Sequence, residues 1–121
     1  MQKIESFTDL IAWKEAHRLA LLIYKVTQDF PRKELFSLVD QMCRCSVSVS
    51  SNVAEGFSRQ TKKEKIQFYY MSLGSLTELQ NQLLIARDIK YVTREKFDEI
   101  ALQTVRVSKL INGLIKSLRR A

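Results

Sequence analysis

The stretch from Gln41 to Gly56, QMCRCSVSVSSNVAEG, decides the fold, because it continues two side-chain stripes that a helix aligns. At about 100° per residue, polar side chains fall on one line and apolar side chains on the line beside it. The polar line is Ser37, Gln41, Arg44, Ser48, Asn52 and Glu55. The apolar line is Leu35, Leu38, Met42, Cys45 and Val49. Solvated faces are usually rich in Lys and Glu, so small hydroxyls and amides predict a packing or interface stripe.

Within this stretch, SVSVS alternates as a strand would, and Val and Ser are poor helix formers. The alternation covers only about five residues, whereas the spacing of three and four continues from Leu35 to Glu55. We therefore predict a helix over about 33–57, with Gly56 as its C-terminal stop.

Three further helices are predicted, over about 9–28, 61–89 and 93–119, from apolar residues spaced by three and four. The last of them has nearly unbroken heptad spacing. The first has Trp13, Ala16, Ala20, Ile23, Thr27 and Phe30 on one face. The third has Ile66, Tyr69, Leu73, Leu76, Leu79, Leu83 and Ala86. The fourth has Phe97, Ile100, Thr104, Val107, Ile111, Leu114 and Leu118.

Proline and capping residues mark the boundaries between these helices. Pro31 ends the first helix and starts a tight connection, while Thr61 with Glu64 forms a capping box before the third. Thr93 can cap the fourth helix. Gly74, in the middle of the third helix, costs about 1 kcal/mol relative to Ala, so we expect another backbone to approach closely there.

Length and composition fit one helical domain spanning 1–121. The 121 residues include one Pro and three Gly, with 45% apolar and 27% charged residues, which favours long uninterrupted helices. Short connections make neighbouring helices antiparallel. The sequence therefore predicts an all-α, antiparallel up-down-up-down four-helix bundle.

The cellular setting follows from two observations. No apolar run approaches the roughly 18 residues that span a bilayer, and MQKIESFTDL lacks the apolar stretch of a signal peptide. We expect a soluble cytoplasmic protein that does not enter membranes. Cys43 and Cys45 point about 200° apart on a helix, so they neither bridge nor chelate together; Cys45 fits the core and Cys43 an edge.

The order of motifs resembles the 23S rRNA-intervening sequence proteins, which are four-helix bundles, and the resemblance covers nearly the whole chain. In the first half, the matching residues are Phe7, Asp9, Leu10, Trp13, Ala16, Phe30, Pro31, Glu34, Leu38, Gln41, Arg44 and Ser48. Further on they are Asn52, Val53, Ala54, Glu55, Gly56, Gly74, Ser75, Leu76, Glu78 and Leu79. The departures are Cys45 and Ser46, where the family often has small apolar residues, and Val53, where Ile is usual.

The resemblance implies a bacterial protein whose family name records genomic location more than biochemistry. A related group, the accessory proteins of diversity-generating retroelements, is similar to a homopentameric barrel that binds nucleic acid and a reverse transcriptase. By that similarity we expect a homo-oligomer, and specifically a pentamer, with a nucleic-acid or protein partner.

The net charge of +7 lies entirely in the second half of the chain. Residues 1–57 hold seven basic and seven acidic groups, whereas residues 58–121 hold thirteen basic and six acidic groups. Such asymmetry favours an anionic partner, RNA or DNA first. Two clusters are the predicted phosphate contacts: Arg59, Lys62, Lys63 and Lys65 around the start of the third helix, and Arg106, Lys109, Lys116, Arg119 and Arg120 on the fourth. An ordinary solvated face remains the alternative.

Catalytic chemistry has little support. His17 is the only histidine, and no His, Cys, Asp and Glu cluster has metal-ligand spacing, so we expect neither an enzyme nor a metal or cofactor. Glu78 is expected to pair with Arg44 across two helices. Phe68, Tyr69 and Tyr70 are expected to face the bundle, which leaves base stacking without support.

The polar stripe has two open readings. Gln41, Arg44, Ser48, Asn52, Glu55 and Glu78 form either a network within one chain or an interface between subunits, and we favour the interface. The leading functional hypothesis is a non-enzymatic oligomer that binds RNA or DNA phosphates. The alternative is a protein-interaction scaffold whose positive charge is incidental.

Overall fold

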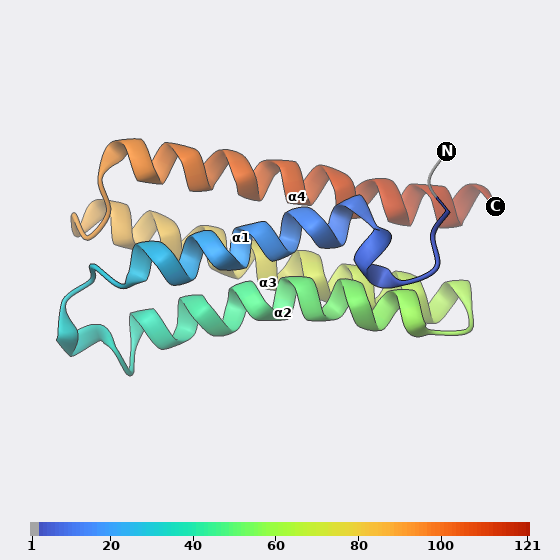
Figure 1. The fold of residues 1–121 in the computed structure, drawn as a ribbon, viewed down its shortest axis with the longest axis horizontal. Helices are drawn as coiled ribbons and strands as arrows, with labels where there is room; N and C mark the ends of the chain where they lie inside the picture. Colours follow the sequence, from blue (N-terminus) through green and yellow to red (C-terminus); the bar gives the residue numbers. More distant parts are fainter. Residues whose placement is uncertain (1–2) are drawn as a thin grey trace.

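The computed structural model describes residues 3–121, which form four long α-helices and two short 3-10 turns, with no strand among them. The helices are α1 (Ile11–Thr27), α2 (Leu38–Ser58), α3 (Lys62–Asp88) and α4 (Arg94–Arg120). The 3-10 turns are η1 (Phe7–Asp9) and η2 (Arg32–Glu34). Each helix packs against its neighbours in the chain, and α1 also packs against α4 (Figure 1). The predicted up-down-up-down bundle is confirmed.

The core consists of the apolar stripes of all four helices. Its largest fully buried apolar side chains are Leu19, Ile23, Met42, Leu76, Leu79, Leu83, Ile100, Ile111, Val49, Val53 and Val107. The heptad residues of α4 are buried or half-buried, as the spacing predicted. Thr61 and Thr93 cap α3 and α4, since each side chain accepts a hydrogen bond from the backbone N–H three residues later.

The predicted start of the second helix was wrong. The chain makes the η2 turn over 32–34, breaks at Ser37, and begins α2 only at Leu38. Ser37 has a backbone conformation outside the helical region (φ −126°, ψ −99°), and its hydroxyl donates to Glu34 instead of capping the helix. As a result Leu35, which the apolar stripe had placed in the core, is 48% exposed.

Two predictions about glycines were also wrong. Gly56 does not end α2, which continues to Ser58, and no glycine has a positive φ among the described residues. Gly56 is instead buried against the ring of Tyr69. Gly74 is exposed, and a Cβ built there has no neighbour within 4 Å. The close helix approach therefore occurs at Gly56.

The two ends of the bundle differ in the segments they bring together. One end, on the right of Figure 1, holds the α2–α3 connection, the C-terminal end of α4 and the segment that contains η1. The other end holds the α1–α2 and α3–α4 connections. Within residues 3–121, none of the helices combines the length and apolar character that crossing a membrane requires.

Candidate nucleic-acid interface

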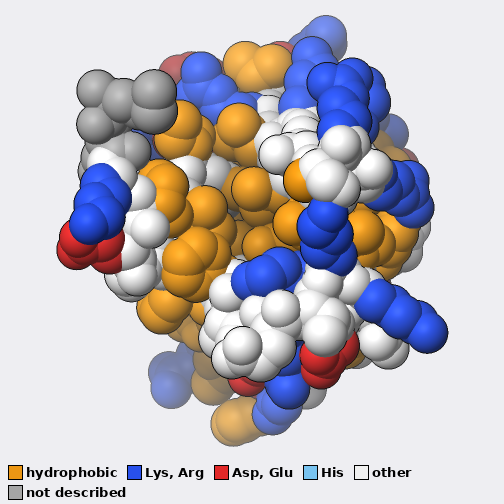
Figure 2. Space-filling view, turned by 90° about the vertical axis from the view of Figure 1, so that its right-hand side faces the viewer, with side chains coloured by type: hydrophobic (Ala, Val, Ile, Leu, Met, Phe, Trp, Pro, Cys, Tyr) orange, Lys and Arg blue, Asp and Glu red, His pale blue; other side chains and the backbone are white. Residues whose placement is uncertain are grey.

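The two basic clusters come together at the end of the bundle. Lys62 Nζ donates a hydrogen bond to the main-chain carbonyl of Ala121. Arg119 donates to the hydroxyl of Tyr70 at 2.6 Å, and its guanidinium lies 5.5 Å from the centre of that ring. The start of α3 and the last turn of α4 therefore share one surface. Figure 2 shows Lys and Arg side chains distributed over this end of the molecule, with few acidic side chains.

Three members of the clusters are exposed and have no carboxylate partner within residues 3–121. They are Lys63, Lys116 and Arg120, whereas Lys62 already donates to Ala121. Between residues 100 and 121 the chain has five basic residues and no acidic one, so nothing on this part of α4 neutralises them. Their charges are available to an anion.

Arg59 and Lys65 are engaged in the corner between α2 and α3. Lys65 Nζ donates to the carbonyl of Phe57 at 2.6 Å and to that of Gly56 at 3.4 Å. These carbonyls belong to the last turn of α2, where helix carbonyls lack backbone partners. Arg59 pairs with Glu55 at 3.1 Å and lies 4.5 Å from the Phe68 ring centre. Both side chains hold the corner together.

The α4 line divides into two parts. Arg106 lies 3.6 Å from Glu15 of α1, and together with Lys109 and Arg18 it lines a groove of about 770 Å³ between α1 and α4. Lys116 and Arg120 lie beyond this groove, toward the end of the bundle. The basic residues predicted to form one row on the fourth helix therefore belong to two different surfaces.

The N-terminus of α3 is already capped. The Thr61 hydroxyl accepts from the Glu64 backbone N–H at 3.1 Å and donates to the Glu64 carboxylate at 3.0 Å. One of the free N–H groups that would attract a phosphate is thus occupied, and Glu64 adds a negative charge. The side chains of Lys62 and Lys63 remain the main attraction for an anion there.

Tyr70 is a candidate contact that the sequence reasoning misplaced. Its side chain is 46% exposed beside Arg119, and Phe57 and Phe68 also lie against cations at this end. The prediction that Phe68, Tyr69 and Tyr70 all face the bundle holds for Tyr69, which is 3% exposed, and is wrong for Tyr70. An exposed ring next to an arginine is the kind of surface on which an unpaired base stacks.

The polar stripe forms hydrogen bonds within the chain. Ser48 and Ser75 hydroxyls share a hydrogen bond at 2.8 Å, which joins α2 to α3. Asn52 Nδ2 donates to the carbonyl and hydroxyl of Ser48 at 2.9 and 3.1 Å. Ser72 Oγ donates to the Val49 carbonyl at 2.7 Å. Small hydroxyl residues thus allow α2 and α3 to pack closely, while the expected subunit contact stays a prediction.

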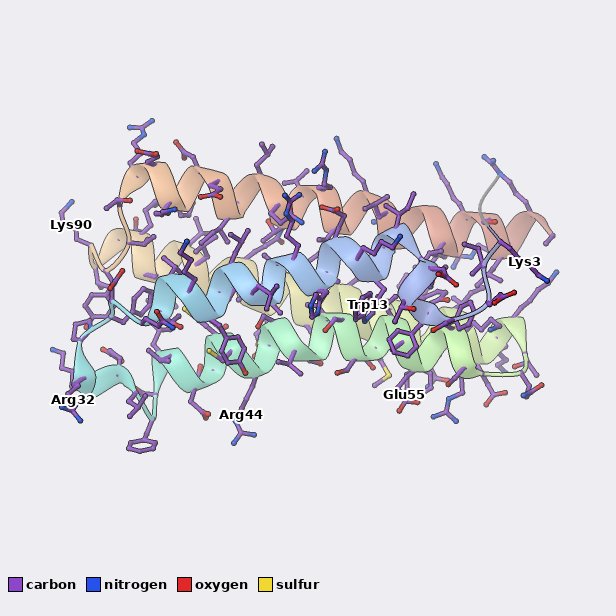
Figure 3. The ribbon with its side chains drawn as sticks, viewed as in Figure 1. Lys3, Trp13, Arg32, Arg44, Glu55 and Lys90 are labelled. Carbon is purple, nitrogen blue, oxygen red and sulfur yellow. The ribbon has the colours of Figure 1, made fainter. Side chains whose placement is uncertain are left out.

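The predicted ion pair between Arg44 and Glu78 was wrong. Arg44 points away from α2 (Figure 3) and pairs with Asp40 one turn earlier, at 2.9 Å. Glu78 instead accepts hydrogen bonds from Cys45 at 2.9 Å and from Gln82 at 3.4 Å. Asp40 lies one turn from Arg44 on the same exposed face of α2 and is therefore closer to it than Glu78, which lies across the α2–α3 contact.

The two cysteines are free thiols, as predicted, with Cys45 buried and Cys43 half-buried. Burial, reinforced by the hydrogen bond to Glu78, raises the pKa of the Cys45 thiol to about 11. A protonated thiol is a weak nucleophile, so Cys45 is a packing residue at neutral pH. His17 is exposed and stacks on Trp13, with ring centroids 4.7 Å apart. Within residues 3–121 no group of three or more His, Cys, Asp and Glu side chains could hold a metal ion.

A nearly uncharged strip along α3 was missed by the sequence reasoning. Residues 66–86 contain one charged residue, Glu78. Its half-exposed apolar side chains are Tyr70, Met71, Leu84 and Ile85, each 42–49% exposed. Depletion of charge with enrichment of Tyr and Met is typical of protein interfaces. The signal was present in the sequence as a run of twenty-one residues with a single charge.

Comparison with known proteins agrees with the fold and the motifs. The sequence model described as "23S rRNA-intervening sequence protein" matches residues 8–113. A crystal structure of a protein of unknown function from the S23 ribosomal protein family of Bacteroides thetaiotaomicron superposes with a TM-score of 0.79. The two sequences are 22% identical, and the alignment covers 88% of this chain and 99% of that one. No curated protein matches the chain. The four-helix fold, the motif order and the match over residues 8–113 show that the chain belongs to the 23S rRNA-intervening sequence protein family.

Proposed function

We propose that this protein is a non-enzymatic nucleic-acid-binding bundle that contacts RNA or DNA phosphates at the end where α3 begins and α4 ends. The observation that carries this proposal is the group of exposed basic residues without carboxylate partners, Lys63, Lys116 and Arg120. Phosphate contacts by Lys and Arg release counterions, so binding should weaken steeply with salt.

The exposed ring of Tyr70 indicates whether single-stranded or duplex nucleic acid should bind more tightly. Three unpaired lysine and arginine side chains would supply affinity without sequence preference, because phosphates carry no sequence information. An exposed ring held by Arg119 adds a stacking surface that only an unpaired base can use. We therefore expect single-stranded RNA or DNA to bind more tightly than a duplex of the same length.

The test is fluorescence anisotropy with a labelled single strand at 50 and 150 mM salt. Lys63→Glu with Lys116→Glu and Arg120→Glu should abolish binding at physiological salt. A matched control, Arg32→Glu with Lys33→Glu and Lys90→Glu, changes the net charge equally at the other end of the bundle, where Figure 3 labels Arg32 and Lys90. The control should retain most of the affinity; equal losses in both variants would show that only net charge matters.

The salt dependence gives a second, independent reading. Each phosphate contact contributes roughly 0.7–0.9 to the slope of log affinity against log salt. A Lys63→Gln substitution should therefore lower that slope by about that amount. Tyr70→Ala should weaken single-strand binding by about 1–3 kcal/mol with the slope unchanged.

We also propose that the protein acts as a homo-oligomer, with a pentamer expected from the family resemblance, and that the α2–α3 face is one of the two surfaces that a ring of subunits needs. The part of the uncharged α3 strip around Met71 and Ile85 supports this proposal, as does the adjacent polar stripe. Met71→Glu with Ile85→Glu should lower the mass measured by light scattering while helicity is retained. Asn52→Leu with Glu55→Leu tests the polar stripe in the same assay.

The alternative function is a protein-interaction scaffold. The same uncharged strip favours it, because the strip would then receive a different protein while the basic end plays no part. The two functions separate cleanly in the anisotropy assay. Absence of binding even at low salt would leave the basic end as ordinary solvated surface and favour the scaffold.

A further inference from the structure

The charges on the outward face of α4 are arranged so that a second, antiparallel copy of this face would oppose each charge with one of opposite sign. Within about 40° of Leu102 on this face the residues are Glu95, Asp98, Leu102, Arg106 and Lys109, and the exposed Glu99 lies about 60° to one side. The spacings are three, four, four and three, so the sequence of charges is symmetric about Leu102 with the sign inverted. Four residues from Leu102 lie Asp98 on one side and Arg106 on the other; seven residues away lie Glu95 and Lys109.

All five side chains point to the same side of the helix and are exposed. Leu102 is 72% exposed and is the most exposed large apolar side chain on any of the four helices. Val105 beside it is 44% exposed. Leu102 and Val105 join Leu22 and Leu110 in one contiguous apolar surface between acidic and basic flanks, and such rimmed patches mark interaction sites.

We propose that a second copy of this chain docks on this face, with the two α4 helices antiparallel and a two-fold axis at Leu102. In an antiparallel pair, residues whose numbers have a constant sum face each other. With Leu102 opposite its counterpart, Asp98 of each copy faces Arg106 of the other, and Glu95 faces Lys109. The interface is isologous, as two-fold symmetry requires.

The existing contacts of these side chains leave room for the new ones. Arg106 lies 3.6 Å from Glu15 through one terminal nitrogen, and 60% of its side chain remains exposed. A guanidinium has five N–H donors, so a second carboxylate can be accommodated. Asp98 pairs with Arg94 at 3.9 Å, and 64% of its side chain is exposed. Within residues 3–121, Lys109 and Glu95 have no oppositely charged partner.

The groove between α1 and α4 continues the apolar surface around Leu102. It is lined by Leu22 and Arg18 of α1 and by Leu102, Val105 and Leu110 of α4. In the two-fold pair the two Leu102 side chains would meet at the axis and cover each other beside this groove. A flat bilayer does not fill a groove, and a nucleic-acid backbone offers no apolar group to cover Leu102, so a helix is the better occupant.

The size of the contact determines its strength. The stripe from Glu95 to Lys109 is about 21 Å long at 1.5 Å per residue, and two packed helices span about 20 Å across. The contact is therefore on the order of 400–600 Å² per partner, the range of weak and transient complexes. Since exposed ion pairs contribute to it, association should depend on concentration and weaken as salt rises.

This contact uses the α1–α4 side of the bundle, whereas the assembly proposed above uses the α2–α3 face. The test must therefore report on α4 alone. Two variants do so when mixed: an acidic one, Arg106→Gln with Lys109→Glu, and a basic one, Glu95→Lys with Asp98→Lys. Circular dichroism of each variant first checks that the bundle is intact.

In sedimentation velocity, each variant alone should associate through α4 roughly tenfold more weakly than the wild type. Mixing the two should restore pairing, because three of the four ion pairs then join opposite charges. The control variant Lys116→Glu with Arg120→Glu lies on the same face outside the paired segment and should leave association unchanged. If the acidic and basic variants bind each other no better than themselves, the proposal is overturned.

The register has its own test. In a Cys43→Ser background, Leu102→Cys should form an intermolecular disulfide under mild oxidation, since the two-fold axis places this residue opposite itself. Lys116→Cys, on the same face but far from the axis, should cross-link much less. Equal cross-linking at both positions would contradict an antiparallel pair centred on Leu102.

Discussion

Adding one methyl group at Gly56 should destabilise the bundle, although the same change elsewhere in its helices should stabilise it. A Cβ at Gly56 would lie 2.6 Å from Cε1 and 2.9 Å from Cδ1 of Tyr69. The Tyr69 side chain is only 3% exposed and cannot turn aside without displacing its neighbours. Gly74 and Gly113, by contrast, have nothing within 4 Å of such an atom.

The magnitudes follow from two opposing effects. Replacing Gly by Ala inside a helix favours the folded state by about 1 kcal/mol. Forcing an extra methyl into a packed site costs about 1–3 kcal/mol. We therefore expect Gly56→Ala to lower the free energy of unfolding by up to about 2 kcal/mol, and Gly74→Ala or Gly113→Ala to raise it by about 1 kcal/mol.

Urea denaturation followed by circular dichroism measures the three changes at one protein concentration. A fourth measurement isolates the clash: in a Tyr69→Leu background, Gly56→Ala should become less destabilising, because the ring edge is gone. A Gly56→Ala protein as stable as Gly74→Ala would refute the reasoning. So would a penalty that does not change when Tyr69 is replaced.

Three further changes test the caps, the connection and the thiols. Thr61→Ala should cost about 1 kcal/mol of stability in urea denaturation, because it removes the hydroxyl that accepts the Glu64 backbone N–H; an unchanged midpoint would contradict the cap. Hydrogen bonds from the Ser37 and Tyr91 hydroxyls hold the pKa of the Glu34 carboxyl below its ordinary value. These hydrogen bonds therefore stabilise the folded state above about pH 4.3, and that stabilisation is lost as the pH falls through the lowered pKa. Glu34→Gln should therefore be less stable than the wild type at pH 7 and differ little from it under strongly acidic conditions, which thermal melts across pH will show. Labelling with a thiol reagent at pH 8 should modify Cys43 first, since burial raises the pKa of Cys45 to about 11; equal rates at the two thiols would contradict that burial.

The fold was predictable because periodicity reports on burial. The heptad spacing of α4 from Phe97 to Leu118 and the stripe of α2 from Leu38 to Val49 both lie in or against the core. The strand-like SVSVS segment did not mislead: Val47 is 42% exposed whereas Val49 is fully buried, and a strand would have placed both on the same face. Thr61 and Thr93 were equally readable, because a cap depends on local geometry alone.

The misplaced features depend on contacts distant in the sequence. The start of α2 is set by Glu34, whose carboxylate accepts a hydrogen bond from Tyr91 fifty-seven positions later, at 2.8 Å. Gly56 is required by Tyr69 on the next helix. Helical periodicity contains no information about either partner, so Pro31 and Gly56 were given only their local roles as helix stops.

At the candidate interface, the sequence identified the charge and its location but not which cations are engaged. Lys65 and Arg59 bind the carbonyls and carboxylate of the α2–α3 corner, and nothing in their spacing distinguishes them from Lys62 and Lys63. Tyr70 was expected to face the bundle together with Phe68 and Tyr69. One step of about 100° separates a buried ring from an exposed one.

The uneven packing among the helices has a consequence for the order in which the bundle opens. α2 and α3 share the most extensive contact, closed by the Ser48–Ser75 and Ser72–Val49 hydrogen bonds, whereas the contact of α1 with α4 is the smallest of the four. In native-state hydrogen exchange, the α2–α3 hairpin should be the last unit to lose protection. The chain would thus behave as a stable α2–α3 hairpin flanked by two helices. These helices separate first along the α1–α4 seam, so partial unfolding begins at that seam.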